Sequence, residues 1–155
     1  MALFSFPAQV NERAARLVAA VVAVTAVASL VGQWRWPIAL LAAGFWLRVG
    51  WGPRFSPLAR AAVAAALRLW PALPVAGPPK RFAQGIGAVV TTVAAASLAS
   101  GGALGWGLVG VLAVFATLEA GFGICFGCWA YGQLQRLGVV PADACVECAE
   151  LRTRA

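Results

Sequence analysis

Apolar residues gather in four long runs along the chain, and short polar stretches separate them. A helix needs about 20 mainly apolar residues to cross the hydrocarbon core of a bilayer, and fewer when flanking side chains reach the headgroups. The pattern therefore predicts an all-α membrane protein, a single membrane domain in which Asn11 caps the first helix. We expect four transmembrane helices, at about residues 15–32, 37–50, 82–100 and 104–130.

A fifth helical segment lies between the second and third runs. Ser56 is placed to cap it and Pro57 occupies its first position, both typical of a helix start. Its apolar and basic residues fall on different sides of a helical wheel, so we expect an interfacial helix at about residues 57–70. After the fourth run, residues 139–155 form a short tail that we expect in the cytoplasm.

Composition and charge support this membrane location. Apolar residues make up 62% of the chain and charged residues only 11%, which lies outside the usual range of soluble domains. The formal net charge of +7 comes from Lys and Arg at the ends of the apolar runs, with no basic stretch interleaved with aromatics. We therefore exclude nucleic-acid binding and expect membrane lipid as a partner. Because cytoplasmic loops retain Lys and Arg, we predict both termini in the cytoplasm.

All four cysteines of the chain occur in Cys-x-x-Cys pairs. Cys125 and Cys128, in "GFGICFGCWAY", are expected on one face of the fourth helix where it leaves the inner leaflet. Cys145 and Cys148, in "PADACVECAEL", lie in the tail, so they cannot fill a membrane core. Both pairs are predicted to face the reducing cytosol, where permanent structural disulfides are rare.

Three interpretations of the cysteines remain open at this point. Packing is the simplest, because a free cysteine behaves as a small buried hydrophobe. The spacing C-x2-C-x16-C-x2-C also fits a four-thiolate zinc site, which would suit a noncatalytic membrane anchor or scaffold. We favour thiol chemistry without a cofactor, in which the pairs cycle between dithiol and disulfide or relay sulfur as a persulfide. The sequence does not decide whether the protein is an enzyme.

Charged residues near the inner ends of the helices add polar support to the first pair. Arg54, Lys80 and Arg81 are expected to converge there, where they would stabilise a thiolate or hold a small sulfur anion. Glu119 lies inside the inner leaflet, and we expect it to form an interhelical salt bridge with Arg48 or Arg81 rather than to deliver protons. Arg48 itself is expected to reach the headgroups. On a continuous helix, Glu119 points away from both thiols.

Small residues on the third and fourth helices, at Gly85, Gly87, Gly123 and Gly127, would allow close contact between copies of the chain. They are compatible with a homo-oligomer. A third functional alternative, a carrier for a small sulfur anion, would require such an assembly.

Several segments resemble a bacterial membrane family named domain of unknown function 4395. The similar segments are "GPRFSPLAR", "PVAGPPKRFAQGIG", "LEAGFGICFGCWAYG" and the tail pair, at residues 52–60, 74–87, 118–132 and 145–148. The resemblance covers nearly the whole chain and implies a bacterial inner-membrane protein. It also implies, by association, a thioredoxin-like or sulfurtransferase partner. No catalytic residue is carried over from the family.

Overall fold

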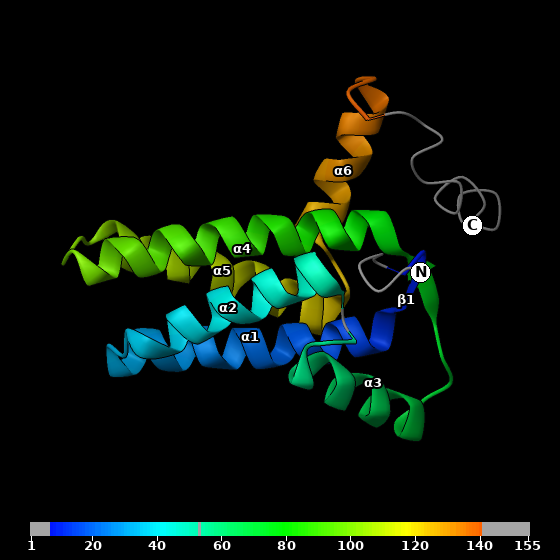
Figure 1. The fold of residues 1–155 in the computed structure, drawn as a ribbon, viewed down its shortest axis with the longest axis horizontal. Coiled ribbons are helices and arrows are strands. Elements are labelled where there is room, and N and C mark those ends of the chain that lie inside the picture. Colours follow the sequence, from blue (N-terminus) through cyan, green and yellow to red (C-terminus); the bar gives the residue numbers. More distant parts are fainter. Residues whose placement is uncertain (1–6, 53, 141–155) are drawn as a thin grey trace.

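The computed structural model describes residues 7–52 and 54–140, which form six helices and a two-stranded sheet (Figure 1). Apart from that short sheet the fold is all-α, as predicted. The elements in chain order are β1 (Gln9–Asn11), α1 (Glu12–Gly32), α2 (Trp36–Trp51), α3 (Pro57–Leu69), β2 (Pro74–Ala76), α4 (Gly77–Ala99), α5 (Leu104–Phe122) and α6 (Phe126–Arg136).

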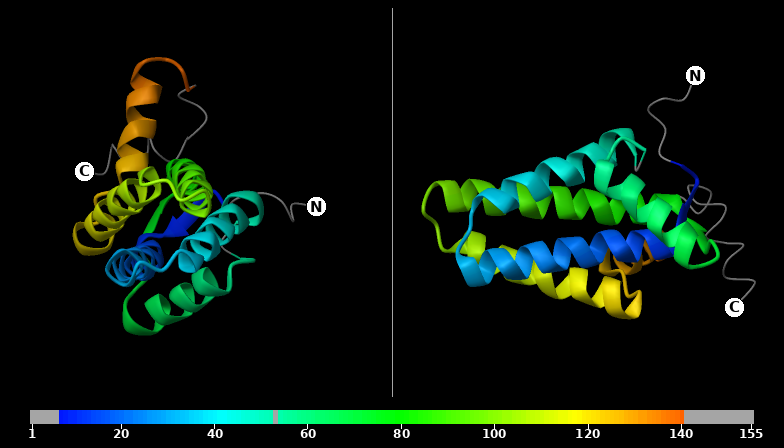
Figure 2. Two further views of the ribbon diagram at one scale, coloured as in Figure 1. Left: turned by 90° about the vertical axis from the view of Figure 1, so that its left-hand side faces the viewer. Right: turned by 90° about the horizontal axis from the view of Figure 1, so that it is seen from below.

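Four helices, α1, α2, α4 and α5, run side by side along the long axis of the molecule (Figures 1 and 2). The main contacts join α1 to α5, α2 to α4, and α4 to α5, while α3 packs on the outer side of α1. The core between them is built from small and medium side chains, among which Ala26, Ile38, Ala88 and Val109 are fully buried. Small core residues let the helix backbones approach closely, which favours helix association in lipid.

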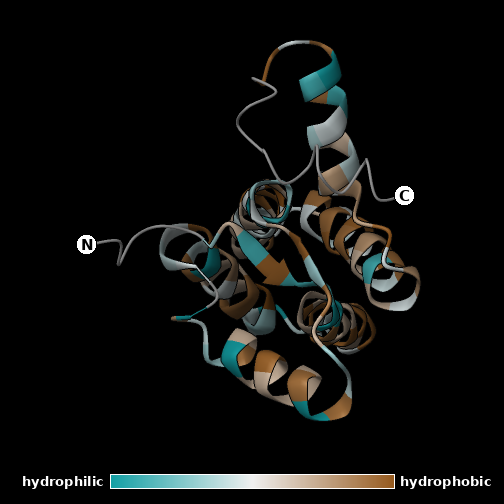
Figure 3. Cartoon of the chain, turned by 90° about the vertical axis from the view of Figure 1, so that its right-hand side faces the viewer, coloured by the Kyte–Doolittle hydropathy of each residue, from teal (hydrophilic) through white to brown (hydrophobic). Residues whose placement is uncertain are grey.

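Three of the described helices, α1, α4 and α5, are long and apolar enough to cross a membrane. Their outer surfaces carry exposed apolar side chains, including Val24, Val89 and Val114. Figure 3 shows hydrophobic residues around the bundle and a mixture of hydrophobic and hydrophilic residues on α3 and α6. These features indicate a multi-pass membrane protein. The predicted second span, α2, has 16 residues, or about 24 Å of helix, and its crossing stays a prediction.

The sheet is an element that the sequence analysis did not predict. β1 and β2 pair antiparallel, with Val10 opposite Val75 and Asn11 opposite Pro74. Two further hydrogen bonds extend the contact, from the Glu12 N–H to the Leu73 carbonyl at 2.8 Å and from the Gly77 N–H to the Ala8 carbonyl at 2.7 Å. The pairing holds the first turns of α1 and α4 next to each other, at the end of the bundle where the thiols lie.

The predicted helix caps are confirmed. The Asn11 side chain accepts a hydrogen bond from the Arg13 N–H at 3.0 Å at the start of α1. Ser56 accepts from the Ala59 N–H at 3.4 Å, and Pro57 is the first residue of α3. Both caps satisfy amide groups that have no carbonyl partner within their helix. The placement of α3 on a membrane surface stays a prediction.

The predicted fourth helix, residues 104–130, is wrong as a continuous element. α5 ends at Phe122, and a separate helix, α6, begins at Phe126 and turns away from the bundle (Figure 1). Gly123 causes the break because its φ of 72° lies in the left-handed region, which ends a right-handed helix. The part of the predicted cytoplasmic tail from residue 141 onward lies outside the described residues.

A matched pair of glycine substitutions in α5 tests the packing of the bundle. A Cβ at Gly105 would lie 2.5 Å from Leu98 Cγ and 2.8 Å from the Ala94 carbonyl oxygen of α4, whereas nothing lies within 4 Å of one at Gly107. We expect Gly105→Ala to lower the free energy of unfolding by about 1–3 kcal/mol through overpacking. Gly107→Ala should leave it unchanged or slightly raised. Thermal unfolding in mild detergent, followed by circular dichroism, measures both, and equal effects would contradict the α4–α5 packing.

Candidate functional site

The chain leaves α5 through a break that α1 stabilises. The Gly123 N–H donates to the Glu119 carbonyl at 3.0 Å and closes the last turn. Arg16, on α1, donates hydrogen bonds to the next two carbonyl groups. Its Nε donates to the Ala120 oxygen at 3.1 Å and its Nη2 to the Gly121 oxygen. Carbonyl groups at a helix end otherwise lack partners. These bonds let the chain change direction within the bundle before α6 begins.

The new direction puts the first cysteine pair at the start of a helix. Cys125 is the N-cap of α6 and has an extended conformation, and its carbonyl accepts the first helical bond from the Trp129 N–H at 3.0 Å. Cys128 lies in the first turn. Gly127 between them packs directly on Ala83 of α4, where a Cβ would overlap Ala83. A thiol at a helix N-terminus is favoured as the thiolate, because the N-terminal end of the helix dipole is positive.

A buried ammonium group joins three helices beside the thiols. Lys80 of α4 is 6% exposed, and its Nζ lies 2.8 Å from Glu119 Oε1 of α5 and 3.0 Å from Glu12 Oε2 of α1. The predicted interhelical salt bridge of Glu119 is therefore confirmed, but its partner is Lys80, so the prediction of Arg48 or Arg81 was wrong. Because a buried charge needs a partner, the cluster fixes these three side chains relative to one another.

The pKa values of the two thiols are shifted in opposite directions by the hydrogen bond between them. The pKa of Cys125 lies below its ordinary value, first because the Cys128 thiol donates a hydrogen bond to it and further because the positive charge of Lys80 is near. Burial and the charge of Glu119 oppose this shift. The pKa of Cys128 is raised, because the hydrogen bond that its S–H group donates to Cys125 and its burial both favour the neutral thiol. This asymmetry favours Cys125 as the thiolate of the pair and Cys128 as the thiol that keeps its proton.

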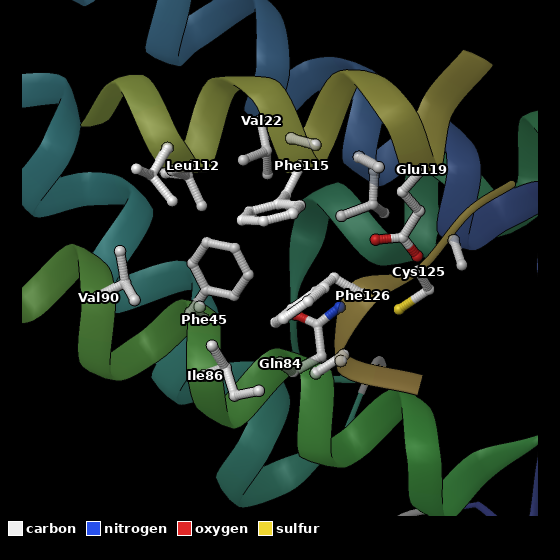
Figure 4. A pocket seen from close by; sticks show the side chains of 18 residues that line it. Val22, Phe45, Gln84, Ile86, Val90, Leu112, Phe115, Glu119, Cys125 and Phe126 are labelled. Carbon is white, nitrogen blue, oxygen red and sulfur yellow. The ribbon is translucent and has the colours of Figure 1, made fainter. Parts of the chain in front are cut away.

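A cavity of about 270 Å³ lies among α1, α2, α4 and α5, with Cys125 at one end (Figure 4). Its walls are mainly apolar, and the rings of Phe45, Phe115 and Phe126 point into it. Polar groups gather at the Cys125 end, where Glu119 and Gln84 also line it. Cys125 and Glu119 therefore share one cavity, although a continuous helix would have turned them apart. The break at Gly123 accounts for this difference.

The structure separates other residues that the sequence analysis grouped with the thiols. Arg54 and Arg81 are exposed, so of the three expected cations it is Lys80 that lies buried beside the pair. Arg48 was expected at the headgroups, but it is 4% exposed: its Nε donates to Gln84 Oε1 at 2.7 Å and its guanidinium lies over the Phe45 ring at 4.5 Å. The bundle supplies these partners, so Arg48 is not required to reach the headgroups. Cys145 and Cys148 lie outside the described residues.

Three residues of the site were missed by the sequence analysis. The sequence analysis did not single out Arg16, Glu12 or Gln84. Glu12 carried a usable signal, because it is one of only five acidic residues in the chain and lies next to a transmembrane run. Gln84 and Arg16 gave no comparable signal, since their partners are distant in sequence.

The first cysteine pair does not form a metal site with other described residues. Within residues 7–52 and 54–140, no three side chains of the His, Cys, Asp or Glu type gather so as to hold an ion. The zinc interpretation therefore requires Cys145 and Cys148, outside that part of the chain. A four-thiolate site would also use Cys128, whose proton has to be lost on metal binding.

Alkylation as a function of pH tests the asymmetry of the pair. In a chain with Cys145 and Cys148 replaced by alanine, iodoacetamide should modify Cys125 faster than Cys128 and at lower pH than an ordinary thiol, since only thiolate reacts and the pKa of Cys125 is lowered. Cys128→Ala removes the hydrogen-bond donor and should move the Cys125 profile to higher pH. Cys128→Ser keeps a donor and should move it less. Identical profiles in all three chains would contradict the assignment.

Comparison with known proteins identifies a family for the chain. No curated protein and no solved structure matches the chain at a significant level. The family described as Domain of unknown function (DUF4395) matches residues 10–136, which include both helices that flank Cys125, the ion cluster and all four bundle helices. The resemblance seen in the sequence is confirmed: the chain belongs to the DUF4395 family.

Proposed function

We propose that Cys125 and Cys128 form a redox-active dithiol that exchanges electrons with a soluble partner at the cytoplasmic face of a bacterial inner membrane. The observation that carries the proposal is the position of Cys125 at the N-cap of α6 with Cys128 in the first turn. This geometry gives one thiol the lower pKa and keeps the second within reach of it. Packing alone does not require such a division of roles between two cysteines.

The exchange balances as a two-electron reaction. The Cys125 thiolate attacks one sulfur of a partner disulfide, forming a mixed disulfide and releasing one partner thiolate. Cys128 then loses its proton and attacks the Cys125 sulfur, which forms the Cys125–Cys128 disulfide and releases the second partner thiolate. The protons of the two cysteines end on the two partner thiols. The partner is reduced and this chain is oxidised, and the reverse sequence oxidises the partner.

The surrounding side chains support this chemistry. Lys80 favours the thiolate of Cys125, and its two carboxylate partners hold it in place at 2.8 and 3.0 Å. Neither thiol belongs to the buried core, and both are partly accessible. Access is necessary for exchange with a protein partner.

The membrane arrangement that goes with this function has four transmembrane helices, α1, α2, α4 and α5, with both termini in the cytoplasm. The basic residues at the inner ends of the apolar runs support this orientation. A thioredoxin-like or sulfurtransferase protein is the proposed partner, and the tail pair Cys145 and Cys148 is the proposed next relay. The reaction needs no metal, because the leaving and attacking groups are all sulfur.

Trapping a mixed disulfide tests the proposed roles. In bacterial membranes, a chain carrying Cys128→Ala should accumulate a disulfide-linked complex through Cys125, because no second thiol can resolve it. Cys125→Ala should not form the complex, since it lacks the nucleophile. Nonreducing electrophoresis, followed by mass spectrometry of the linked peptides, measures both.

Two controls sharpen the trapping experiment. Replacing Cys145 and Cys148 by alanine in the Cys128→Ala chain shows whether the tail pair contributes to the exchange. An amount of trapped complex that does not change on this replacement would contradict the relay. If Cys125→Ala traps the partner and Cys128→Ala does not, the assignment of the two thiols is reversed. The absence of any complex in all variants would contradict exchange with a protein partner.

A further inference from the structure

The cavity beside Cys125 has a polar end, an apolar body and an opening to the outside of the bundle. Among the described residues that line it, Glu119 alone carries a charge, and it lies with Cys125 and Gln84 at one end. Along α5 and at the start of α6, Val111, Phe115 and Phe126 are 48, 38 and 44% exposed, so the cavity is open there rather than enclosed. In a bilayer this opening faces lipid, because α5 is one of the candidate spans.

We propose that this cavity binds a lipid-soluble quinone, which accepts the electrons of the Cys125–Cys128 dithiol. The inference rests on the proposed function, since it requires the pair to cycle between dithiol and disulfide. A dithiol that receives electrons from a soluble partner needs a second acceptor for turnover, and the cavity connects the nucleophilic thiol with the membrane.

The lining fits an aromatic ring with carbonyl oxygens better than an acyl chain. Phe45, Phe115 and Phe126 surround the space, and the rings of Phe115 and Phe126 stack at a centroid distance of 4.7 Å, offering aromatic surfaces for another planar ring. The Gln84 amide is oriented by Arg48, whose Nε donates to Oε1 at 2.7 Å. This leaves the amide nitrogen, on the Cys125 side in Figure 4, to donate to a quinone carbonyl. An acyl chain would use none of these polar groups.

The size of the cavity sets how much of the ligand it holds. Its volume of about 270 Å³ lies just below the usual range for small-molecule sites, which begins at about 300 Å³. From Ala83 to Val90, which both line it, α4 rises about 10 Å. This space suits one substituted ring, and an isoprenoid tail would leave through the opening beside α5 into lipid.

The electron transfer balances without any further reagent. The Cys125 thiolate adds to a ring carbon of the quinone and forms a carbon–sulfur bond. Cys128 then attacks the Cys125 sulfur, forming the disulfide and breaking the carbon–sulfur bond, and the ring leaves as hydroquinone. The quinone gains two electrons and two protons, and the two thiols lose the same number. Cys125 lines the cavity while Cys128 lies outside its lining, in keeping with the order of the two steps.

Adjacent valines on α4 provide a matched test. Val90 lines the cavity, whereas Val89 is 55% exposed and lies outside the lining. Reduced full-length protein in detergent is mixed with decylubiquinone, and hydroquinone formation is followed by absorbance while peptide mapping locates the disulfide. We expect one hydroquinone per Cys125–Cys128 disulfide. Val90→Phe should raise the quinone concentration for half-maximal rate by about tenfold or more, because the ring fills the site. Val89→Phe should match the unmodified protein.

Each outcome bears on the proposal. Equal rates for Val90→Phe and Val89→Phe would overturn the site. Oxidised glutathione serves as a second oxidant for the unmodified protein: if it oxidises the pair and decylubiquinone does not, the quinone inference fails and the proposed dithiol function stands. If neither oxidises the pair, both fail.

A photoreactive ubiquinone analogue provides a test that needs no substitution, in case Val90→Phe does not fold. On the unmodified protein it should label peptides of α4 and α5 that line the cavity, and excess decylubiquinone should prevent the labelling. Labelling elsewhere, or labelling that decylubiquinone does not prevent, would overturn the inference.

Discussion

The termination of α5 is the constraint on which the site depends. A left-handed Gly123 stops the helix, and Arg16 from α1 binds the carbonyls of Ala120 and Gly121. If α5 did not end there, Cys125 would lie in the middle of a long helix, and the backbone amides next to it would already donate to carbonyls of the preceding turn. Because α5 does end there, Cys125 occupies the N-cap of a new helix. The position of the thiol at a helix start thus follows from a backbone conformation two residues before it.

The ion cluster connects that thiol to the rest of the bundle. Lys80, Glu12 and Glu119 come from three helices, and the β1–β2 pairing brings the first turns of α1 and α4 close enough for the contact. Buried ion pairs contribute little net stability, because desolvation offsets their attraction. Their value here is positional: the cluster keeps a positive charge beside Cys125 and a carboxylate at the polar end of the cavity.

Much of the fold was readable from the sequence, and the parts that were not depend on contacts distant in the chain. Apolar runs and capping residues such as Asn11 and Ser56 located the helices, because these signals are local. The glycines around Cys125 were ambiguous, since a glycine that ends a helix and one that allows close packing look the same in a sequence. Gly123 does the first and Gly127 the second. Interpreting both as packing residues kept the helix continuous and turned Glu119 away from the thiols. The pairing of Lys80 with Glu12 and Glu119 had no local signal.

These features describe a multi-pass membrane protein whose bundle places Cys125 both at the start of α6 and at one end of an apolar cavity. The central claim is that Cys125 and Cys128 interconvert reversibly between dithiol and disulfide. The most direct measurement is a redox titration of purified protein with Cys145 and Cys148 replaced by alanine, in glutathione buffers of graded potential, with alkylation and peptide mapping at each step. We predict a single reversible two-electron transition at this pair. A pair that stays as free thiols at every potential, in protein that remains folded, would contradict the claim.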